Sequence, residues 1–395
     1  MQSHRSINDK QDRSIGLVME KMQFAALVLM TMLTIKLLVL PRWAVSTHTM
    51  STVRWLMAGG TALLGVQFLL QFTLQLRTTG HINQAIMLNL ALFIPCSALI
   101  SLAVLYLQRR GRITHLERFI SLPIWALAMI LIAIGIKVDG GRMDSVAPTL
   151  KQAEIVASSG YALMQFFYSI QSMREMRRIK QAIANYYDED MDSMLQWMQL
   201  SIVVLTLMAV LVPIMIFGNG NWLASFGLLV FGGIFYLIDS FCLYAVSSAP
   251  AKVQEAEESE DNDKTEEKMD NDSAINTKVN AIDMEAMQRV STAIEHWIEL
   301  GGYLQSGLKL PSAAEEIGVP RYQLSSWLKM QGKHYSDWIT YLRINEAKRI
   351  LKKNREWSNE AVAQHCGFSD RSYFQKKFKE STGMTPADYL LTLTD

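Results

Sequence analysis

The stretch HCGFSDRSYFQKKFKESTGMTPADYL, residues 365–390, decides the fold of the C-terminal part of this chain. Gly367 marks a turn, and a basic segment follows in which Phe374 and Phe378 are four positions apart. Residues four apart share one face of a helix, so both rings are expected in the core and the basic side chains outside. A short helix, a glycine turn and a basic second helix are typical of a helix-turn-helix motif.

A second motif of the same kind precedes this one. The segment SAAEEIG ends in a turn at Gly318, and RYQLSSWLKM, residues 321–330, predicts the second helix. Leu324 and Leu328 are again four apart and are expected to face the core. A long helix over residues 336–353 joins the two motifs.

The charge of this region supports nucleic-acid binding. Residues 321–379 contain 13 basic and 5 acidic side chains, a net charge of +8, whereas the whole predicted domain, 284–395, is close to neutral. A basic patch confined to two candidate reader helices is typical of phosphate binding. The outward-facing residues that we predict to contact DNA are Arg321, Tyr322, Gln323, Ser325, Ser326 and Lys329 in the first reader, and Arg371, Ser372, Gln375, Lys376 and Lys379 in the second.

Three segments carry a family resemblance: LRINEAKRIL (342–351), VAQHCGFSDRSYFQKKFK (362–379) and TGMTPADY (382–389). With them, residues 300–390 resemble the DNA-binding domain of the AraC/XylS transcription regulators. The resemblance implies a monomeric module that places two recognition helices in successive major grooves. The DNA-contact positions that it implies are Tyr322, Ser325, Ser326, Arg371, Ser372, Tyr373 and Lys376.

The first reader departs from the pattern of that family. Pro320 stands where a Ser or Asp cap is common, and Ser325 and Ser326 are short where long polar side chains are frequent. Short side chains reach base edges less easily, so we expect this reader mainly to hold phosphates.

The first 250 residues have the composition of a membrane domain. A helix needs about 20 mostly apolar residues to cross the hydrocarbon core. The candidate spans are residues 22–40, 55–76, 84–107, 119–136, 153–171, 199–217 and 222–246. The predicted fold class is therefore all-α, with a polytopic bundle of about seven transmembrane helices and a C-terminal domain of about seven helices that contains two helix-turn-helix units.

The predicted domains are an N-terminal tail (1–21), a transmembrane domain (22–247), an acidic disordered linker (248–283) and the DNA-binding domain (284–395). The linker is assigned because residues 251–272 contain ten acidic residues and three lysines, a net charge of −7. Such a segment has too few large apolar side chains to fold.

The number of spans decides the orientation. The fifth candidate contains Glu154, Gln165 and Gln171, and could instead be an amphipathic surface helix, which would leave six spans. Seven spans place both dense basic clusters, 108–118 and 174–180, on the side of the C-terminal domain, as the positive-inside rule favours. A count over all loops favours six, but six spans would translocate the cluster at 108–118. We prefer seven, with the C-terminal domain in the cytoplasm and the chain in a bacterial inner membrane.

Lys36 in the first span and Asp239 in the last are charges inside apolar segments. Such charges are costly in a bilayer and usually pair or line a cavity, although both could instead extend toward the interface. With seven spans the two residues lie in the same leaflet, and we predict an ion pair between them.

The sequence predicts no enzyme, no cofactor and no metal site, because it lacks clustered catalytic residues and metal-ligand spacing. The predicted function is a membrane-anchored, one-component transcription regulator that senses a signal in its membrane domain. Its predicted partners are double-stranded promoter DNA and the lipid bilayer. RNA polymerase and a second copy of the chain stay open as partners, and the signal ligand is not identified. The alternative is a membrane transporter or receptor with an accessory DNA- or protein-binding tail.

Overall fold

The computed structural model describes residues 2–76, 82–140, 148–189, 192–217, 221–259, 261 and 279–393. These residues are helical or in turns, with one isolated β-bridge, and they form two compact units. The bundle unit comprises Met1–Arg177 and Gln196–Ala249. The C-terminal unit comprises Arg178–Leu195 and Pro250–Asp395, so it includes a segment from the middle of the chain.

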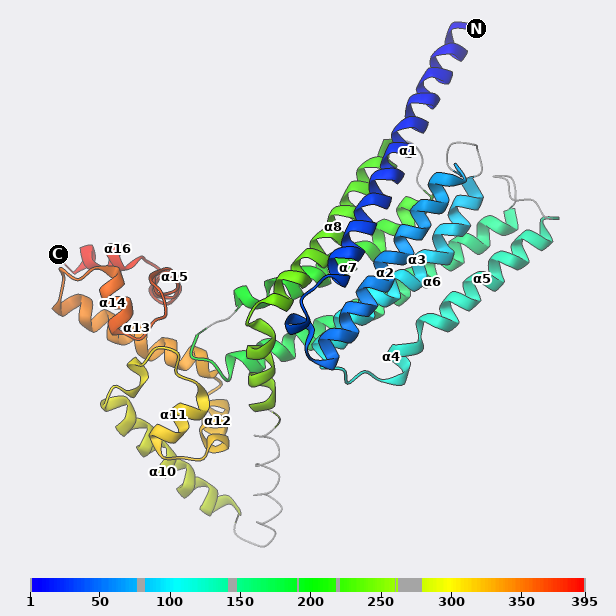
Figure 1. The fold of residues 1–395 in the computed structure, drawn as a ribbon. Coiled ribbons are helices and arrows are strands. Elements are labelled where there is room, and N and C mark those ends of the chain that lie inside the picture. Colours follow the sequence, from blue (N-terminus) through cyan, green and yellow to red (C-terminus); the bar gives the residue numbers. More distant parts are fainter. Residues whose placement is uncertain are drawn as a thin grey trace. The chain divides into compact units, whose positions relative to one another are not determined.

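From residue 279 onward, the described part of the C-terminal unit contains seven α-helices, as predicted, and a short 3₁₀ turn, η2 (Gly302–Leu304). The helices are α10 (Val279–Glu299), α11 (Leu310–Ile317), α12 (Arg321–Met330), α13 (Tyr335–Lys353), α14 (Asn359–His365), α15 (Arg371–Thr382) and α16 (Pro386–Thr392) (Figure 1). One core gathers around Trp338 and includes Leu324 and Leu328. A second core includes Phe374 and Phe378. The long helix predicted over 336–353 is α13, confirmed to within one residue.

The first part of the predicted disordered linker differs from the expectation. Residues 249–259 are helical, and Val253 and Ala256, spaced for one helix face, are buried. Glu255 accepts a hydrogen bond from the Lys309 ammonium at 2.6 Å, and this bond holds the pKa of the Glu255 carboxyl below its ordinary value. Because the segment contains many acidic residues, its composition predicted a disordered linker and gave no sign of the apolar face. Residues 260 and 262–278 of the predicted linker lie outside the described part of the chain.

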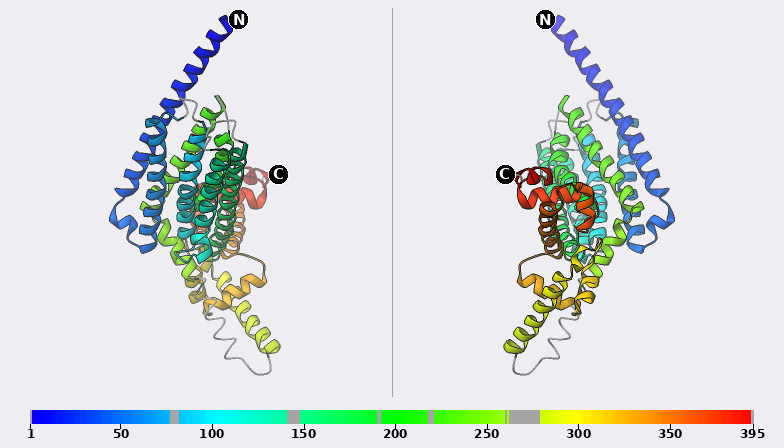
Figure 2. Two further views of the ribbon diagram at one scale, coloured as in Figure 1. Left: turned by 90° about the vertical axis from the view of Figure 1, so that its right-hand side faces the viewer. Right: turned by 90° about the vertical axis from the view of Figure 1, so that its left-hand side faces the viewer.

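In the bundle unit, seven long helices run side by side (Figures 1 and 2). They are α1 (Gln2–Leu38), α2 (His48–Thr73), α3 (Ile82–Gln108), α5 (Ser121–Val138), α6 (Pro148–Ala184), α7 (Asp192–Phe217) and α8 (Asn221–Val246). The last turns of α6 and the first turn of α7 belong to the C-terminal unit. Two short elements, η1 (Arg42–Val45) and α4 (His115–Phe119), connect neighbours in the bundle. The predicted N-terminal tail is helical from residue 2 and continuous with the first span.

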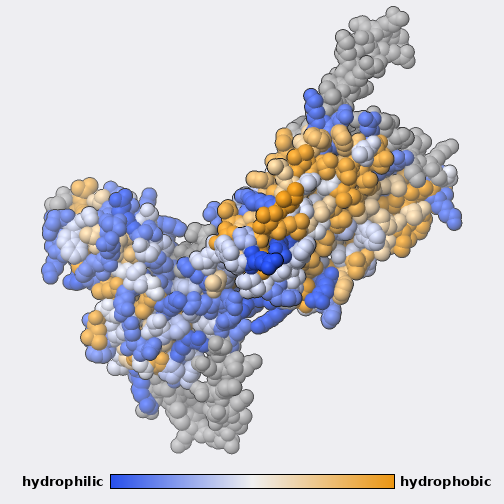
Figure 3. Space-filling view, in the orientation of Figure 1, coloured by the Kyte–Doolittle hydropathy of each residue, from blue (hydrophilic) through white to orange (hydrophobic). Residues whose placement is uncertain are grey.

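Six helical segments among the described residues are long and apolar enough to cross a membrane. They are Glu20–Leu38, His48–Thr73, Gln84–Gln108, His115–Val138, Leu195–Ile214 and Gly227–Val246. The space-filling view shows hydrophobic side chains over the outer surface of the bundle (Figure 3). Because water would penalise so much exposed apolar surface, this face suits a lipid environment.

The expected fifth span, α6, is less apolar than these six segments, yet one face of it packs against the bundle. Gln165 is fully buried, and its Nε2 donates to Ser101 Oγ at 2.9 Å and to the Leu205 carbonyl at 3.3 Å. The Tyr161 hydroxyl donates to the Met208 carbonyl at 3.4 Å. The polar side chains of α6 thus bond to α3 and α7. Hydrogen bonds of this kind are common between membrane helices. A helix that buries its polar face against the bundle and exposes apolar side chains such as Leu163 fits a membrane span better than an amphipathic surface helix.

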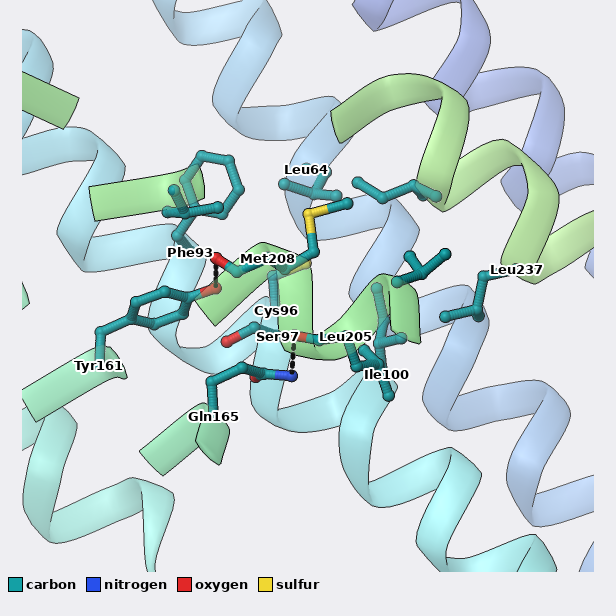
Figure 4. Close-up of a pocket in the computed structure, with 13 residues that line it drawn as sticks. Leu64, Phe93, Cys96, Ser97, Ile100, Tyr161, Gln165, Leu205, Met208 and Leu237 are labelled. Carbon is teal, nitrogen blue, oxygen red and sulfur yellow. Dashed lines mark hydrogen bonds between the residues drawn. The ribbon is translucent and has the colours of Figure 1, made fainter. Parts of the chain in front are cut away.

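A small cavity lies where α2, α3, α6, α7 and α8 meet (Figure 4). Its lining is mostly apolar and includes Leu64, Phe93 and Ile234. Tyr161 and Gln165 lie at the edge of the cavity, and both side chains donate hydrogen bonds to backbone carbonyls of α7 (Figure 4). The hydrogen bonds that join α6 to α7 therefore border this cavity.

The structure brings the two predicted intramembrane charges together. Lys36 Nζ on α1 forms an ion pair with Asp239 Oδ1 on α8, and the two helices are neighbours in the bundle. The two residues are 203 positions apart in the chain, so the contact depends on how the bundle closes.

Exchanging the two charges tests the contribution of this ion pair. Lys36→Asp and Asp239→Lys each place two like charges together in the apolar layer, and each is expected to lower the yield of folded protein in detergent. The double variant restores the pair and is expected to recover most of that yield. Lys137→Asp is the control, because it reverses a charge at the exposed end of α5 that does not belong to the Lys36–Asp239 pair. A double variant no better than either single variant would contradict the role of the pair.

Candidate nucleic-acid interface

The second helix-turn-helix unit is built from α14, a turn at Gly367, and α15. Ser358 Oγ accepts from the Ala361 amide at 3.1 Å and caps α14, while Asp370 Oδ1 accepts from the Tyr373 amide at 2.7 Å and caps α15. Gly367 has a φ of +82°, and a Cβ there would lie 2.4 Å from the carbonyl oxygen of Leu304. Only glycine fits this turn, because a side chain would be strained and would collide with backbone.

On α15 the buried and exposed faces are those predicted. Phe374 and Phe378 are fully buried. Four of the predicted contact residues are exposed: Arg371, Ser372, Lys376 and Lys379. Tyr373 and Gln375 are half-buried, and the Tyr373 ring packs against Phe368 with centroids 6.1 Å apart. The helix therefore presents a basic, largely open face.

The first reader, α12, is more covered. Lys329 is exposed, but the other predicted contact residues of this helix are half-buried: Arg321, Tyr322, Gln323, Ser325 and Ser326. Arg321 Nη1 donates to Ser259 Oγ at 3.1 Å, so the helical segment 249–259 reaches the start of α12. Gln323 Nε2 donates to the Tyr322 hydroxyl at 3.2 Å. Pro320 stands at the N-cap without a side-chain capping bond, as the sequence suggested.

The helix that joins the two readers, α13, holds a fully buried arginine. Arg343 Nε donates to the Tyr303 carbonyl at 2.9 Å, and its Nη2 donates to the Gln305 carbonyl at 2.5 Å. The same Nη2 donates to Asp188 Oδ2 at 2.7 Å. Arg343 belongs to the segment LRINEAKRIL, whereas Asp188 lies far outside the region with the family resemblance.

The sequence analysis missed the segment to which Asp188 belongs. Residues 185–189, NYYDE, lie between α6 and α7 and form part of the C-terminal unit. The available signal was two adjacent tyrosines, because aromatic side chains are large apolar groups that a solvent-exposed connection does not need. Tyr186 and Tyr187 are both buried.

The exposed basic residues of α12 and α15 determine what this surface can do chemically. Lysine and arginine side chains neutralise phosphates and release counterions, which supplies affinity without sequence information. An arginine near the start of a helix in the major groove can donate two hydrogen bonds to guanine O6 and N7. The residues needed for both kinds of contact are present, and they are most open on α15.

The comparisons with known proteins agree with this geometry. Residues 313–391 match the family model of a helix-turn-helix domain. The chain is 30% identical over 91 residues to the regulatory protein PocR of Salmonella typhimurium, and 43% identical over 70 residues to the HTH-type transcriptional regulator YobQ of Bacillus subtilis. It is 31% identical over 98 residues to the HTH-type transcriptional regulator YpdC of Escherichia coli.

These matches cover 23%, 18% and 25% of this chain, and 30%, 29% and 33% of the three relatives. The chain therefore spans about a third of the length of these relatives. No solved structure matches the chain. The C-terminal region is an AraC-type helix-turn-helix domain of the kind found in transcription regulators.

The two ends of the exposed face of α15 are expected to differ in role. Arg371, exposed at the start of the helix, is expected to read a base, so Arg371→Ala should remove about 1–3 kcal/mol of discrimination at one base pair. Lys379, two turns further along, is positioned for a phosphate, so Lys379→Ala should weaken all sites alike and reduce the salt slope by about one. Titration against single-base operator variants at several salt concentrations measures both effects. The reverse pattern would mean that α15 docks differently.

Proposed function

We propose that this chain is a membrane-anchored, one-component transcription regulator that binds promoter DNA through α12 and α15 and senses a signal in its bundle unit. One observation carries the proposal: an AraC-type helix-turn-helix domain shares a chain with six helices long and apolar enough to cross a membrane. Both properties belong to the same polypeptide, so membrane attachment and DNA binding need no second subunit.

The proposed location is the bacterial inner membrane, with the C-terminal unit in the cytoplasm. The relatives reported above are bacterial, and promoter DNA lies in the cytoplasm. The packing of α6 among the other helices supports seven crossings, which put the basic clusters 108–118 and 174–180 on the cytoplasmic side.

The rival function is a transporter with an accessory tail. Transporters commonly build their sites from helices that are interrupted near the middle of the bilayer. Pro95 and Pro213 lie inside α3 and α7, yet both helices continue through them. Among the described residues of the bundle, this continuity favours a sensor and anchor over a transporter.

The cavity between α2, α3, α6, α7 and α8 is the proposed site of signal detection. Its apolar lining suits a small apolar molecule that partitions into the bilayer. Because the cavity adjoins the hydrogen bonds that α6 makes to α3 and α7, a molecule there can shift α6 against its neighbours.

Filling this cavity tests signal detection. Ser97 is half-buried and lines the cavity, so Ser97→Phe occupies the space that a signal molecule would take. We expect the promoter activity of the target to stop responding to growth conditions, while DNA binding by the purified protein is unchanged. Ser159→Phe is the matched control because Ser159 lies on the exposed face of α6. A normal response in Ser97→Phe would exclude the cavity as the sensing site.

The proposed function as a whole is tested with the intact protein in zwitterionic lipid nanodiscs. A duplex selected from a random-sequence pool should bind, and the logarithm of the affinity should fall with the logarithm of salt concentration with a slope of about −3 to −4, as expected for about four exposed cations. These four are Lys329, Arg371, Lys376 and Lys379. Changing all four to alanine should abolish binding. An intact protein that selects no sequence would contradict the proposal.

A further inference from the structure

Residues 185–189, which connect α6 to α7, form an acidic strap on the C-terminal unit. All five residues make hydrogen bonds to other parts of this unit. Asn185 Oδ1 lies 2.8 Å from His334 Nδ1, at the start of α13. The Tyr186 carbonyl accepts from the Leu310 amide at 2.9 Å, and Tyr187 forms an antiparallel bridge with Lys309. This part of the strap therefore holds the residues that lead into the first helix-turn-helix unit.

Two tyrosines of the strap form hydrogen bonds to the helical segment 249–259. The Tyr186 hydroxyl donates to Glu255 Oε1 at 2.8 Å, and the Tyr187 hydroxyl donates to Glu255 Oε2 at 3.1 Å. Lys309 bonds to the same carboxylate. Burial raises the pKa of both tyrosine hydroxyls, so they stay protonated and keep donating.

Asp188 connects the residues before the first helix-turn-helix unit to α13, the helix that joins the two readers. Its Oδ2 accepts from the Leu308 amide at 2.9 Å and from Arg343 Nη2 at 2.7 Å. The Arg343 side chain has no exposed surface, and only 4% of the Asp188 side chain is exposed. A charge buried to this degree requires a partner, so the carboxylate is bound firmly in place.

Glu189 connects the strap to the second helix-turn-helix unit. Its Oε1 accepts from the Ser369 amide at 2.7 Å, and its Oε2 accepts from Ser369 Oγ at 2.5 Å. Ser369 immediately precedes Asp370, the residue that caps α15. Two consecutive acidic residues thus bond to the segment before α11, to α13 and to the residue before the cap of α15.

We propose that residues 185–189 are a positioning element that fixes α12 and α15 relative to each other, so that the state of the α6–α7 connection sets the affinity for an operator with two half-sites. This inference rests on the proposed function, because it concerns how the same two readers bind DNA. Two linked binding events gain affinity only if the linkage allows both to occur together. An element that holds the linkage therefore controls two-site binding without touching DNA.

Three duplexes and the intact protein in zwitterionic nanodiscs test this role. The first duplex is selected by the wild-type protein from a random pool, and each of the other two has one half-site scrambled. Asp188→Asn should weaken binding to the two-site duplex by about tenfold or more, and binding to the single-site duplexes by less than about twofold, because only the linkage is lost. Glu189→Ala should act in the same direction, by about threefold. Glu189→Ala carries the test alone if Asp188→Asn does not fold.

The control variant is Glu356→Gln, which removes an exposed acidic charge elsewhere in the C-terminal unit. Loss of an acidic charge by itself should raise the affinity for all DNA, so a loss confined to the two-site duplex identifies the strap. Equal losses on all three duplexes, or unchanged two-site binding in the variants, would overturn the inference while leaving the proposed function intact. A wild-type protein that selects no duplex from the random pool would overturn the proposed function itself.

Discussion

The guanidinium of Arg343 has no contact with solvent, and its Nε and Nη2 donate to acceptors inside the protein, while Nη1 lies 4.0 Å from Glu189 Oε1. It bonds to the carbonyls of Tyr303 and Gln305 and to the Asp188 carboxylate. Those acceptors come from the entry to the first helix-turn-helix unit and from the α6–α7 connection. One buried cation thereby joins segments that are far apart in the chain.

Polar contacts also join helices in the bundle unit, where most of the surroundings are apolar. Lys36 and Asp239 meet across α1 and α8, and Gln165 bonds to α3 and α7. A polar group without a partner in hydrocarbon is costly, so each of these contacts selects one arrangement of the helices. In both units the apolar residues supply most of the burial, while a few polar contacts determine which helices are neighbours.

Local spacing explains what the sequence could predict. Leu324, Leu328, Phe374 and Phe378 are buried as expected because helical periodicity is a local property. The pairing of Asp188 with Arg343 spans 155 positions and leaves no local pattern. Arg321, at the start of α12, bonds to a helical segment, 249–259, whose acidic composition predicted a disordered spacer. Hydropathy alone does not identify α6 as a membrane span, because it counts polar side chains that neighbouring helices satisfy with hydrogen bonds.

We propose that one chain reads DNA while it remains in the membrane. The most direct measurement is genome-wide DNA occupancy of the intact protein, crosslinked in living cells and recovered from the membrane fraction. The account predicts discrete promoter sites that share two half-sites about one helical turn apart. Those sites should lose occupancy in the Arg371→Ala variant. Enrichment found only with a released soluble C-terminal fragment, or no enriched sites in the membrane fraction, would contradict it.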